Sequence, residues 1–504
     1  MAATHSSAWF KLSSNKEADE CGSQASISVE GLRHSPDDPA SSRLKDMVVI
    51  AHDFYHSLHT PMLYSAARQA AQDALIAEVK QAYSDLPAPS ETDSPSGPFS
   101  LGEILALKSK MPNSAPGPDG IQYAFWKSLA SRIDDLRKTG SRIPSFWSTY
   151  KCLTDDLCLH GTNRLSFKDA NLSLFFKKGD PTLVANYHPI SSMNTDCKMY
   201  TNLINARLAP WAVTKLHPDQ KGFVPLRCIT EHTCLCSEVA HLCNKTGTPG
   251  YIVSLDQAKA YDCVDSALLI RTLSAMGLPA DLVHLISDVL VNCCTRVRIN
   301  GGYSGFFSLC RGVRQGDPLS CLLYDFSIEP MGMHLRRSIS GISLLGLQPV
   351  RLIQYADDMN LFLSDEENLP LICETMDDTS FTLSSLFNLN KTNVLVVSSL
   401  EHRNAPHPGI TDCFTGGFII PPGLPLRVLG TWVGSPNHAE DRWEQIYSHI
   451  KKIVHQWNAI GTSLLNHALL AKALLLSRCY YLLDCNGIPT KLLNKITSTV
   501  CRFV

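Results

Sequence analysis

The sequence has little excess charge of either sign. Its 504 residues include 45 Lys or Arg and 47 Asp or Glu, which gives a formal net charge of −2 at pH 7. Composition as a whole therefore does not identify a nucleic-acid-binding protein. Charge is unevenly spread, however, and residues 441–504 are locally basic, with eight Lys or Arg against three Asp or Glu. Such a stretch is compatible with contact to a phosphate backbone, and equally with an ordinary solvated helix face.

Apolar segments of the kind that direct a chain to or across a membrane are also missing. The opening residues, MAATHSSAWFKLSSNKEADE, contain no apolar run of the kind that begins a secreted protein. We therefore expect an intracellular protein whose 18 cysteines are reduced. The longest apolar stretch, residues 467–485, is interrupted by Lys472 and Arg478, so we expect a packed helix and no membrane partner.

The cysteines do not follow a recognisable zinc-binding pattern. Four cysteines and two histidines lie between Cys228 and Cys243, but their spacing matches none of the usual ligand sets. This segment is more typical of one amphipathic helix with buried thiols. No internal repeat is present.

Strands and helices alternate along most of the chain. We expect residues 1–98 to be a flexible arm and a helical extension that ends in a Pro/Ser linker. Ser100 and Glu103 form a capping-box pattern that starts the next helix. From about residue 170, apolar strands interleave with periodic helices, and 44% of all residues are hydrophobic. The pattern predicts an α+β fold with a mixed or antiparallel sheet, and not a doubly wound parallel one.

Two adjacent aspartates, Asp357 and Asp358, occupy the centre of QYADDMN (residues 354–360), between two short apolar strands. A surface turn can contain such a pair without any function. Asp256, however, ends another apolar strand, YIVSLDQ (residues 251–257), and a hairpin beside that strand would bring the carboxylates together. Clustered carboxylates raise one another's pKa unless a cation neutralises them, and oxygen ligands favour Mg²⁺. Two such ions form the clamp used by polymerases and by nucleases.

Collinear motifs extend this pattern to a known family. LDQAKAYDCVD, RGVRQGDPLSCLLYDFSIEPM and YADD, in that order, resemble successive palm motifs of the reverse transcriptase of non-LTR (LINE-type) retrotransposons. Upstream, APGPDGI, FFKKGDPTLVANYHPISSMNTDCKMYTNLINARL and DQKGFVPLR resemble finger segments. Downstream, FNLNKT, RVLGTWVG and the tail that begins DRWEQI resemble the last palm motifs and the thumb. The resemblance runs from about residue 46 to the C-terminus and is greatest to fungal elements.

The resemblance implies a right-hand polymerase fold and an RNA-directed DNA polymerase. We expect fingers over residues 99–250, a palm with an antiparallel sheet over residues 251–435, and a partial, truncated helical thumb over residues 436–504. The implied cofactor is Mg²⁺, as two ions for which Mn²⁺ can substitute. The implied partners are an RNA template, a DNA primer or nicked target DNA, and dNTPs. A nuclear location is expected from the family, although no targeting signal is clear.

The resemblance also assigns roles to single residues. The implied catalytic and metal-binding residues are Asp256, Asp357 and Asp358, with Lys391 beside the departing pyrophosphate. The implied nucleotide-binding residues are Lys177, Lys178, His188, Tyr261, Gln315 and Gly316, and Leu429 and Gly430 are the implied primer-binding turn. Tyr261 would exclude a 2′-hydroxyl from the site. The sequence does not choose between Lys177 and Lys178, and each of these residues also has an ordinary structural explanation as a core aromatic, a turn glycine or a surface lysine.

Three departures from the family pattern favour a damaged copy. His188 stands where the family has an arginine that binds the triphosphate, and Leu226 stands where glycine is usual. The chain is also shorter than a full element, and we expect a fragment without the endonuclease. The alternatives are a remnant that folds and binds RNA without polymerising, and a metal-dependent nuclease or nucleotide cyclase on a related palm. The segment RQGDPLS and the finger motifs argue against the last of these.

Overall fold

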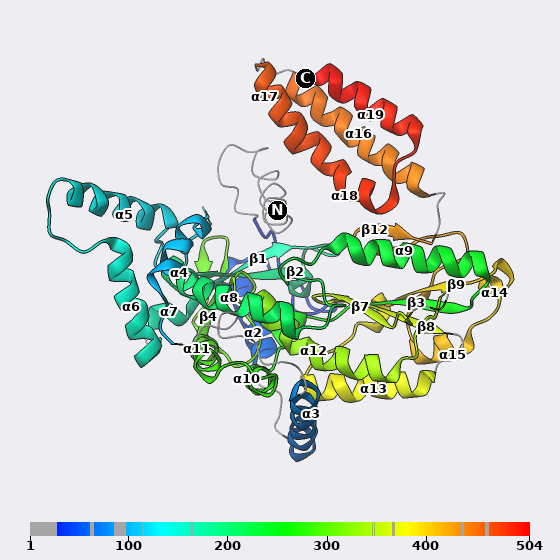
Figure 1. Ribbon diagram of the computed structural model, residues 1–504, viewed down its shortest axis with the longest axis horizontal. Helices are drawn as coiled ribbons and strands as arrows, with labels where there is room; N and C mark the ends of the chain where they lie inside the picture. The colour runs from blue at the N-terminus through cyan, green and yellow to red at the C-terminus, as the bar shows by residue number, and fades with distance from the viewer. Residues whose placement is uncertain are drawn as a thin grey trace.

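The computed structural model describes residues 28–60, 65–84, 97–112, 114–162, 165–344, 346, 348–364, 368–434, 438–458 and 463–504. Most of the predicted N-terminal arm (residues 1–27) and of the Pro/Ser linker (residues 85–96) lies outside these ranges. The described chain forms two five-stranded sheets, a short hairpin and a C-terminal helical bundle (Figure 1).

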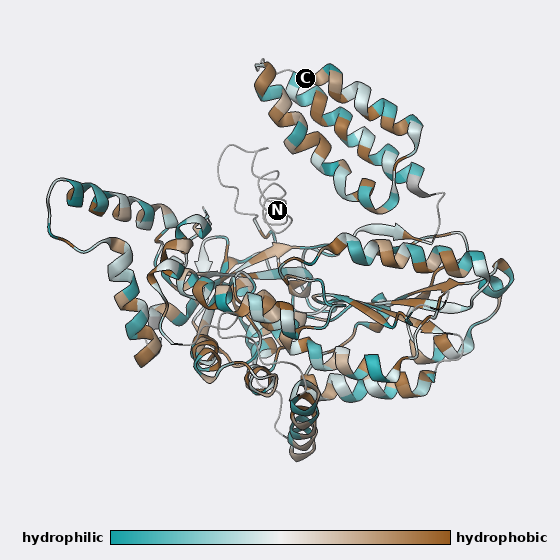
Figure 2. Ribbon diagram, in the orientation of Figure 1, coloured by the Kyte–Doolittle hydropathy of each residue, from teal (hydrophilic) through white to brown (hydrophobic). Residues whose placement is uncertain are grey.

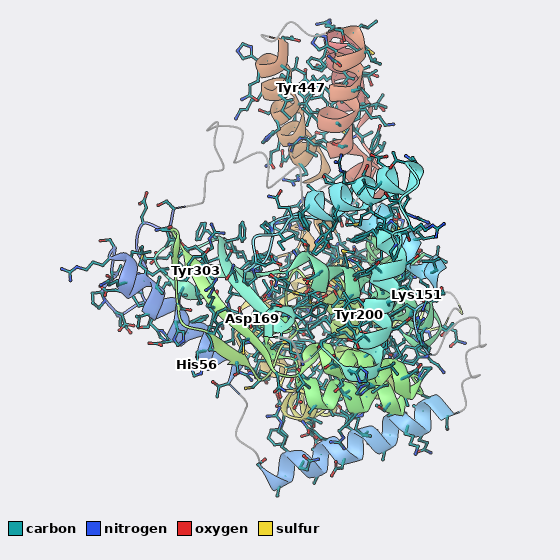
Figure 3. The ribbon with its side chains drawn as sticks, turned by 90° about the vertical axis from the view of Figure 1, so that its left-hand side faces the viewer. His56, Lys151, Asp169, Tyr200, Tyr303 and Tyr447 are labelled. Atoms are coloured by element: carbon teal, nitrogen blue, oxygen red, sulfur yellow. A yellow bond between two sulfur atoms is a disulfide. The ribbon has the colours of Figure 1, made fainter. Side chains whose placement is uncertain are left out.

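The first sheet, called here the finger sheet, has the strand order β2-β1-β4-β5, with β6 also paired to β4. Its strands are β1 (Asp169–Phe176), β2 (Tyr187–Met193), β4 (Cys293–Ile299), β5 (Gly302–Tyr303) and β6 (Phe307–Leu309). β1 is antiparallel to β2 and parallel to β4. β1 and β2 lie in the span predicted for the fingers, whereas β4, β5 and β6 (residues 293–309) lie in the span predicted for the palm. The finger sheet therefore combines strands from both predicted spans. Asp169 and Tyr303 mark this sheet in Figure 3.

Helix α2 (Leu44–His59) covers the finger sheet with one apolar face. Met47, Ala51 and Tyr55, spaced four residues apart, are buried in a cluster that includes Val297 and Leu172 of the sheet. Because residues four apart lie on the same side of a helix, this spacing directs all three toward the strands. The N-terminal extension thus begins as a packed helix, as its sequence predicts.

The second sheet, called here the palm sheet, has the order β10-β9-β3-β8-β7. Its strands are β3 (Gly250–Leu255), β7 (Leu352–Tyr355), β8 (Asp358–Ser364), β9 (Asn393–Val397) and β10 (Phe418–Ile419). All neighbouring strands are antiparallel except β9 and β10. The α+β prediction with a mixed or antiparallel sheet is confirmed, and so is the hairpin that carries Asp357 and Asp358.

Both faces of the palm sheet are buried, because alternate residues of a strand point to opposite faces. Ile252 and Phe362 pack in one cluster with Cys236 of helix α9 (Ile229–Thr246). Val253 and Leu361 belong to the main core on the other face, where helices α12 (Ser320–Ser338) and α13 (Leu369–Leu383) pack together. The cysteine-rich segment is therefore one helix with Cys236 and Cys243 buried, as predicted.

The remaining elements surround these two sheets. They are α3 (Ala66–Ser84), α4 (Leu101–Ala106), η1 (Leu107–Lys110), α5 (Tyr123–Lys138), α6 (Phe146–His160), α7 (Leu165–Lys168), η2 (Val184–Asn186), α8 (Thr195–Lys215), η3 (Ala260–Cys263), α10 (Ser266–Ala275), α11 (Ala280–Leu290), η4 (Leu389–Lys391), α14 (Leu400–Asn404) and α15 (Pro408–Cys413). The predicted capping box is present at the start of α4. Ser100 Oγ accepts from the Glu103 backbone, and the Glu103 carboxylate accepts from the Ser100 backbone.

The C-terminal helices form a separate cluster, called here the thumb bundle. It consists of α16 (His438–Asn458), α17 (Leu464–Leu470), the π-helical turn η5 (Ala471–Leu476), α18 (Ser477–Asn486) and α19 (Thr490–Phe503). Trp443, Leu475 and Ile496 are among the residues at its centre. Each of these helices carries both hydrophobic and hydrophilic residues around its axis (Figure 2). Tyr447 marks the bundle in Figure 3.

Two hydrogen bonds join the thumb bundle to the hairpin of β11 (Leu426–Val428) and β12 (Thr431–Val433). The Tyr481 hydroxyl donates to the Leu429 carbonyl oxygen at 2.6 Å, and Asn486 Nδ2 donates to the Trp432 carbonyl oxygen at 2.9 Å. Helix α18 also contacts α9. The bundle is therefore attached to the turn of this hairpin as well as to the palm.

One expectation about cysteine is wrong. Cys373 of α13 and Cys413 of α15 form a disulfide, so the thiols are not all reduced. The other cysteines within the described ranges are free. Across the same ranges, the helices that are long enough to cross a bilayer are too polar to do so.

Candidate active site

Two neighbouring strands of the palm sheet deliver the three aspartates to one edge. Asp256 directly follows β3, whereas Asp357 lies in the β7–β8 turn and Asp358 is the first residue of β8. Leu255 is paired with Met359, so the strand register places Asp256 level with Asp358. The turn is held by the Ala356 N–H, which donates to Gln220 Oε1 at 2.9 Å. The proximity expected from the sequence is therefore present.

The carboxylates influence one another electrostatically. Partial desolvation, followed by the charges of Asp357 and Asp256, raises the pKa of Asp358 to about 6. The pKa of Asp357 is also raised, first by desolvation and then by Asp256. Lys177 opposes both shifts. Because both aspartates remain exposed, solvent screens part of this repulsion, and a cation between the carboxylates would relieve the rest.

Lys391 is the direct partner of Asp256. Its Nζ lies 3.0 Å from a carboxylate oxygen of Asp256, and both side chains are partly exposed. The backbone fixes this pairing, because the Asn388 N–H donates to the Asp256 carbonyl oxygen at 2.8 Å. The lysine that the resemblance assigned to the departing pyrophosphate thus stands beside the first carboxylate of the site.

The described residues do not gather three or more His, Cys, Asp or Glu side chains in an arrangement that holds a metal ion. The donor chemistry nevertheless fits a hard cation. Asp256, Asp357 and Asp358 offer only carboxylate oxygens, which are the ligands of Mg²⁺ and Mn²⁺. A cation held among them would relieve the repulsion that, after desolvation, raises the pKa of Asp358.

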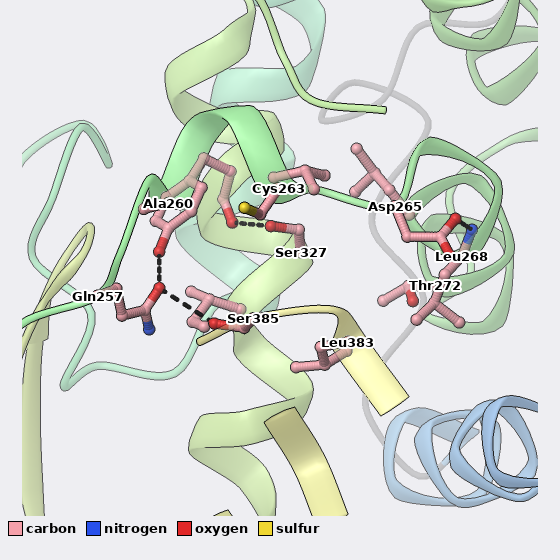
Figure 4. A pocket seen from close by; sticks show the side chains of 13 residues that line it. Gln257, Ala260, Cys263, Asp265, Leu268, Thr272, Ser327, Leu383 and Ser385 are labelled. Carbon is pink, nitrogen blue, oxygen red and sulfur yellow. Dashed lines mark hydrogen bonds between the residues drawn. The ribbon is translucent and has the colours of Figure 1, made fainter. Parts of the chain in front are cut away.

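Tyr261 lies close to this cluster and is held by a stacked neighbour. Its ring is 4.7 Å from that of Tyr324, with 12° between the ring planes. The Tyr324 hydroxyl donates to Gln257 Oε1, which is also within hydrogen-bond distance of Ser385 Oγ (Figure 4). Gln257, Tyr324 and Ser385 border a cavity of about 20 Å³. Gln257, the residue after Asp256, therefore holds the Tyr324 ring that supports Tyr261. This connection was not predicted from the sequence.

Gln315 and Gly316 contact the finger sheet. The Ser191 N–H of β2 donates to the Gln315 carbonyl oxygen at 2.7 Å. Gly316 has a φ of +112°, and a Cβ at this position would lie 2.7 Å from the Ser191 carbonyl oxygen. The close contact between the backbones of Gly316 and Ser191 therefore requires glycine here, whether or not a nucleotide also approaches Gly316.

Three basic residues line the finger side of the carboxylates. Lys177 directly follows β1, and the exposed His188 lies on β2, where it is paired with Phe175. Desolvation, Lys177 and Lys259 lower the pKa of His188, so its imidazole is neutral at pH 7. Of the two candidate lysines, Lys177 acts on both Asp357 and Asp358.

Lys259 was not identified from the sequence. Its Nζ donates to the Ala185 carbonyl oxygen at 3.0 Å and lies 5.5 Å from the centre of the Phe54 ring. Lys259 is the one basic residue of the motif LDQAKAYDCVD, and its place in that motif could have identified it as a candidate site residue.

The remaining predicted positions lie in turns with unusual backbones. Leu429 and Gly430 join β11 to β12, with φ values of +48° and +86°. Leu226 has a φ of +66° and is 97% exposed. The left-handed region favours glycine, so the departure from the family pattern at Leu226 coincides with a strained backbone.

Comparisons with known proteins agree with this architecture. The family model described as reverse transcriptase (RNA-dependent DNA polymerase) matches residues 176–433. The chain is 29% identical over 414 residues, 81% of its length, to the transposon TX1 uncharacterized 149 kDa protein of Xenopus laevis, and covers 30% of that protein. It is 25% identical over 337 residues, 66% of its length, to the retrovirus-related Pol polyprotein from type-1 retrotransposable element R2 of Popillia japonica, and covers 42% of it.

A third relative is the retrovirus-related Pol polyprotein from type-2 retrotransposable element R2DM of Drosophila melanogaster. The identity is 26% over 193 residues, which are 38% of this chain and 18% of that protein. The chain thus spans less than half the length of each of these relatives. All three come from animals, and the greater similarity to fungal elements stays a prediction. The family match, with its motifs carried on the palm and finger sheets, confirms the α+β right-hand polymerase fold. The chain belongs to the reverse transcriptase (RNA-dependent DNA polymerase) family, and non-LTR retrotransposon proteins are its relatives.

Proposed function

We propose that the chain is an RNA-directed DNA polymerase of a non-LTR retrotransposon, which transfers nucleotides from dNTPs to a primer 3′-hydroxyl on an RNA template. The observation that carries this proposal is the meeting of Asp256, Asp357 and Asp358 at one edge of the palm sheet. We assign the fingers to residues 99–250, the palm to residues 251–435 and a partial thumb to residues 436–504, with the strands of residues 293–309 completing the finger sheet.

In this proposal the three aspartates hold two Mg²⁺ ions, for which Mn²⁺ can substitute. Bound ions of this kind supply charge neutralisation at the reacting phosphorus. The chain itself supplies position and charge. Lys177, and not Lys178, faces the triphosphate, because it is the lysine that acts on Asp357 and Asp358. Lys391 lies beside Asp256.

Tyr261 in this assignment lies beneath the incoming sugar. Its ring is fixed by Tyr324, and a fixed ring excludes a 2′-hydroxyl more strictly than a mobile one. Gln315 and Gly316 would contact the nucleotide from the loop that binds β2, and His188 would contact the triphosphate as a neutral hydrogen-bonding group. Leu429 and Gly430 would contact the primer end. The partners are an RNA template and a DNA primer or nicked target DNA, and we place the activity in the nucleus.

Primer extension on a primed RNA homopolymer tests this function. The purified chain is assayed with Mg²⁺ and with Mn²⁺ in turn, and Asp357→Asn serves as the matched variant. We expect DNA synthesis that disappears in Asp357→Asn while the circular dichroism spectrum is unchanged. A folded wild-type chain that binds the primed RNA without extending it, with either ion, would overturn the proposal in favour of a non-catalytic remnant.

A further inference from the structure

A second cavity lies where the thumb bundle meets the palm. Its volume is about 510 Å³, and its walls come from α9, α14, β12, α16 and α18. We call it the junction cavity, and Figure 1 shows α18 close to β12 and α9 in this region. The volume lies within the range of small-molecule sites, roughly 300–1,000 Å³. The cavity includes none of the residues assigned to the carboxylate site.

The charge of the junction cavity is one-sided. Arg403 of α14 and Arg442 of α16 line it, together with His241 of α9, and its described lining contains neither Asp nor Glu. Arg442 donates to the neutral side chain of Gln445 at 3.1 Å. The Nε–H groups of both arginines are buried and lack a hydrogen-bond acceptor among the described residues. Two guanidinium groups without a carboxylate partner in the part of the chain that the structure describes, in one partly enclosed space, favour an anionic ligand, and the planar guanidinium is suited to phosphate.

The rest of the wall is suited to a planar ring. Trp432 and Leu482 line the cavity, and Trp432 lies on β12 with part of its surface exposed. Asn486 is held by its bond to the Trp432 carbonyl oxygen, and its own Oδ1 is buried with no donor from the described residues. A ring that stacks on tryptophan and carries an amino group would satisfy both features.

We propose that the junction cavity binds a nucleotide unit, with the phosphate at Arg403 and Arg442 and the base between Trp432 and Asn486. The unit comes either from a free nucleotide or from a strand of nucleic acid, because both offer the same phosphate and base. This site is separate from the carboxylate cluster and does not depend on polymerase activity.

Titration of the full chain in the presence of EDTA tests the site, because chelation removes the divalent ions that a polymerase site needs. The probes are ATP and, in a second arm, a single-stranded oligonucleotide, and the signal is tryptophan fluorescence. We expect saturable quenching that is retained in Asp357→Asn and weakened at least tenfold in the double variant Arg403→Gln/Arg442→Gln. Lys451→Gln/Lys452→Gln removes two exposed charges elsewhere on α16 and should bind as wild type does.

Ser237→Asp provides an independent variant if the arginine variant does not fold. Ser237 lines the same cavity, so the new carboxylate should repel the phosphate and also weaken binding. Saturation by ATP assigns the ligand to free nucleotides, and saturation by the oligonucleotide alone assigns it to a strand. The proposal is overturned if neither probe saturates the wild-type signal, or if the arginine and Ser237→Asp variants fold and bind with wild-type affinity.

Discussion

The ammonium group of Lys391 lies 3.0 Å from the carboxylate of Asp256, the first of the three aspartates at the edge of the palm sheet. Lys391→Met leaves this carboxylate without its cation. Losing one charged hydrogen bond, worth about 1.5–3 kcal/mol, should slow single-turnover nucleotide incorporation roughly 10- to 100-fold.

Stability should hardly change in this variant, because ion pairs that are partly exposed contribute only about 0–1 kcal/mol. Urea unfolding measured beside the incorporation assay separates the two effects. A variant that unfolds at lower urea but incorporates nucleotides at the wild-type rate would assign Lys391 a purely structural role.

Lys177 and Lys178 form a matched pair, since both are exposed and adjacent in the same finger turn. Lys177 is the one of the two that lowers the pKa of Asp357 and Asp358. We expect Lys177→Ala to raise the KM for dNTP about tenfold or more, the equivalent of one charged contact. Lys178→Ala should stay within about twofold of wild type. Equal losses in the two variants, measured by steady-state primer extension, would contradict the assignment.

His188→Arg should improve nucleotide use. The histidine is neutral at pH 7 because desolvation and two neighbouring lysines lower its pKa. An arginine in its place keeps its charge at all accessible pH values and offers a two-pronged donor. We expect kcat/KM for dNTP to rise roughly tenfold, mainly through KM. An unchanged or lower kcat/KM in primer extension would show that this site is adapted to a neutral group.

The pKa of Asp358, about 6, makes stability depend on pH. This value lies above the ordinary 3.8, so between the two values the folded state binds more protons than the unfolded state. The contribution of Asp358 to stability therefore falls as pH rises from about 4 to about 6. Because solvent screens the exposed side chain, Asp358→Asn should raise the free energy of unfolding at pH 7 by only about 1 kcal/mol.

Thermal unfolding in EDTA at pH 4 and pH 7 measures this effect. The gain from Asp358→Asn should be absent at pH 4, where the wild-type carboxyl is already protonated. A gain of the same size at both pH values would mean that repulsion among the carboxylates is not its cause.

Leu226→Gly should stabilise the fold. Leucine at φ +66° adopts a conformation that costs an L-residue about 1–2 kcal/mol, and a side chain that is 97% exposed makes few compensating contacts. Glycine is more flexible in the unfolded chain, and this entropic cost offsets part of the benefit. We therefore expect the free energy of unfolding, measured by chemical denaturation, to rise by about 0.5–1 kcal/mol. Leu226→Ala is the control and should give no gain, because it retains a Cβ.

Local patterns were sufficient to predict much of the fold. The apolar run in YIVSLDQ and the apolar flanks of the AspAsp pair predicted β3 and the β7–β8 hairpin, and the amphipathic pattern of the cysteine-rich segment predicted α9. The parallel pairing of β1 with β4 was not predicted, because it joins segments more than a hundred residues apart and no local period encodes such a pairing. The disulfide between Cys373 and Cys413 was missed for a similar reason.

The candidate site divides in the same way. Its carboxylates were recognisable because charged residues at the end of an apolar strand are conspicuous. The Tyr324 ring beneath Tyr261 and the Ser191 carbonyl beside Gly316 were not recognisable, because each depends on side-chain or backbone placement across two distant elements. Sequence motifs thus predicted which residues the fold brings to the candidate site, but not which residues hold them in place.

The hydrogen bonds from Tyr481 and Asn486 to the β11–β12 hairpin have a mechanical consequence. A rotation of α18 must either break both bonds or carry the Leu429–Gly430 turn with it. The orientation of the helical bundle and the position of this turn are therefore coupled. Under the proposed function, in which this turn contacts the primer end, a movement of the turn would therefore also move the bundle.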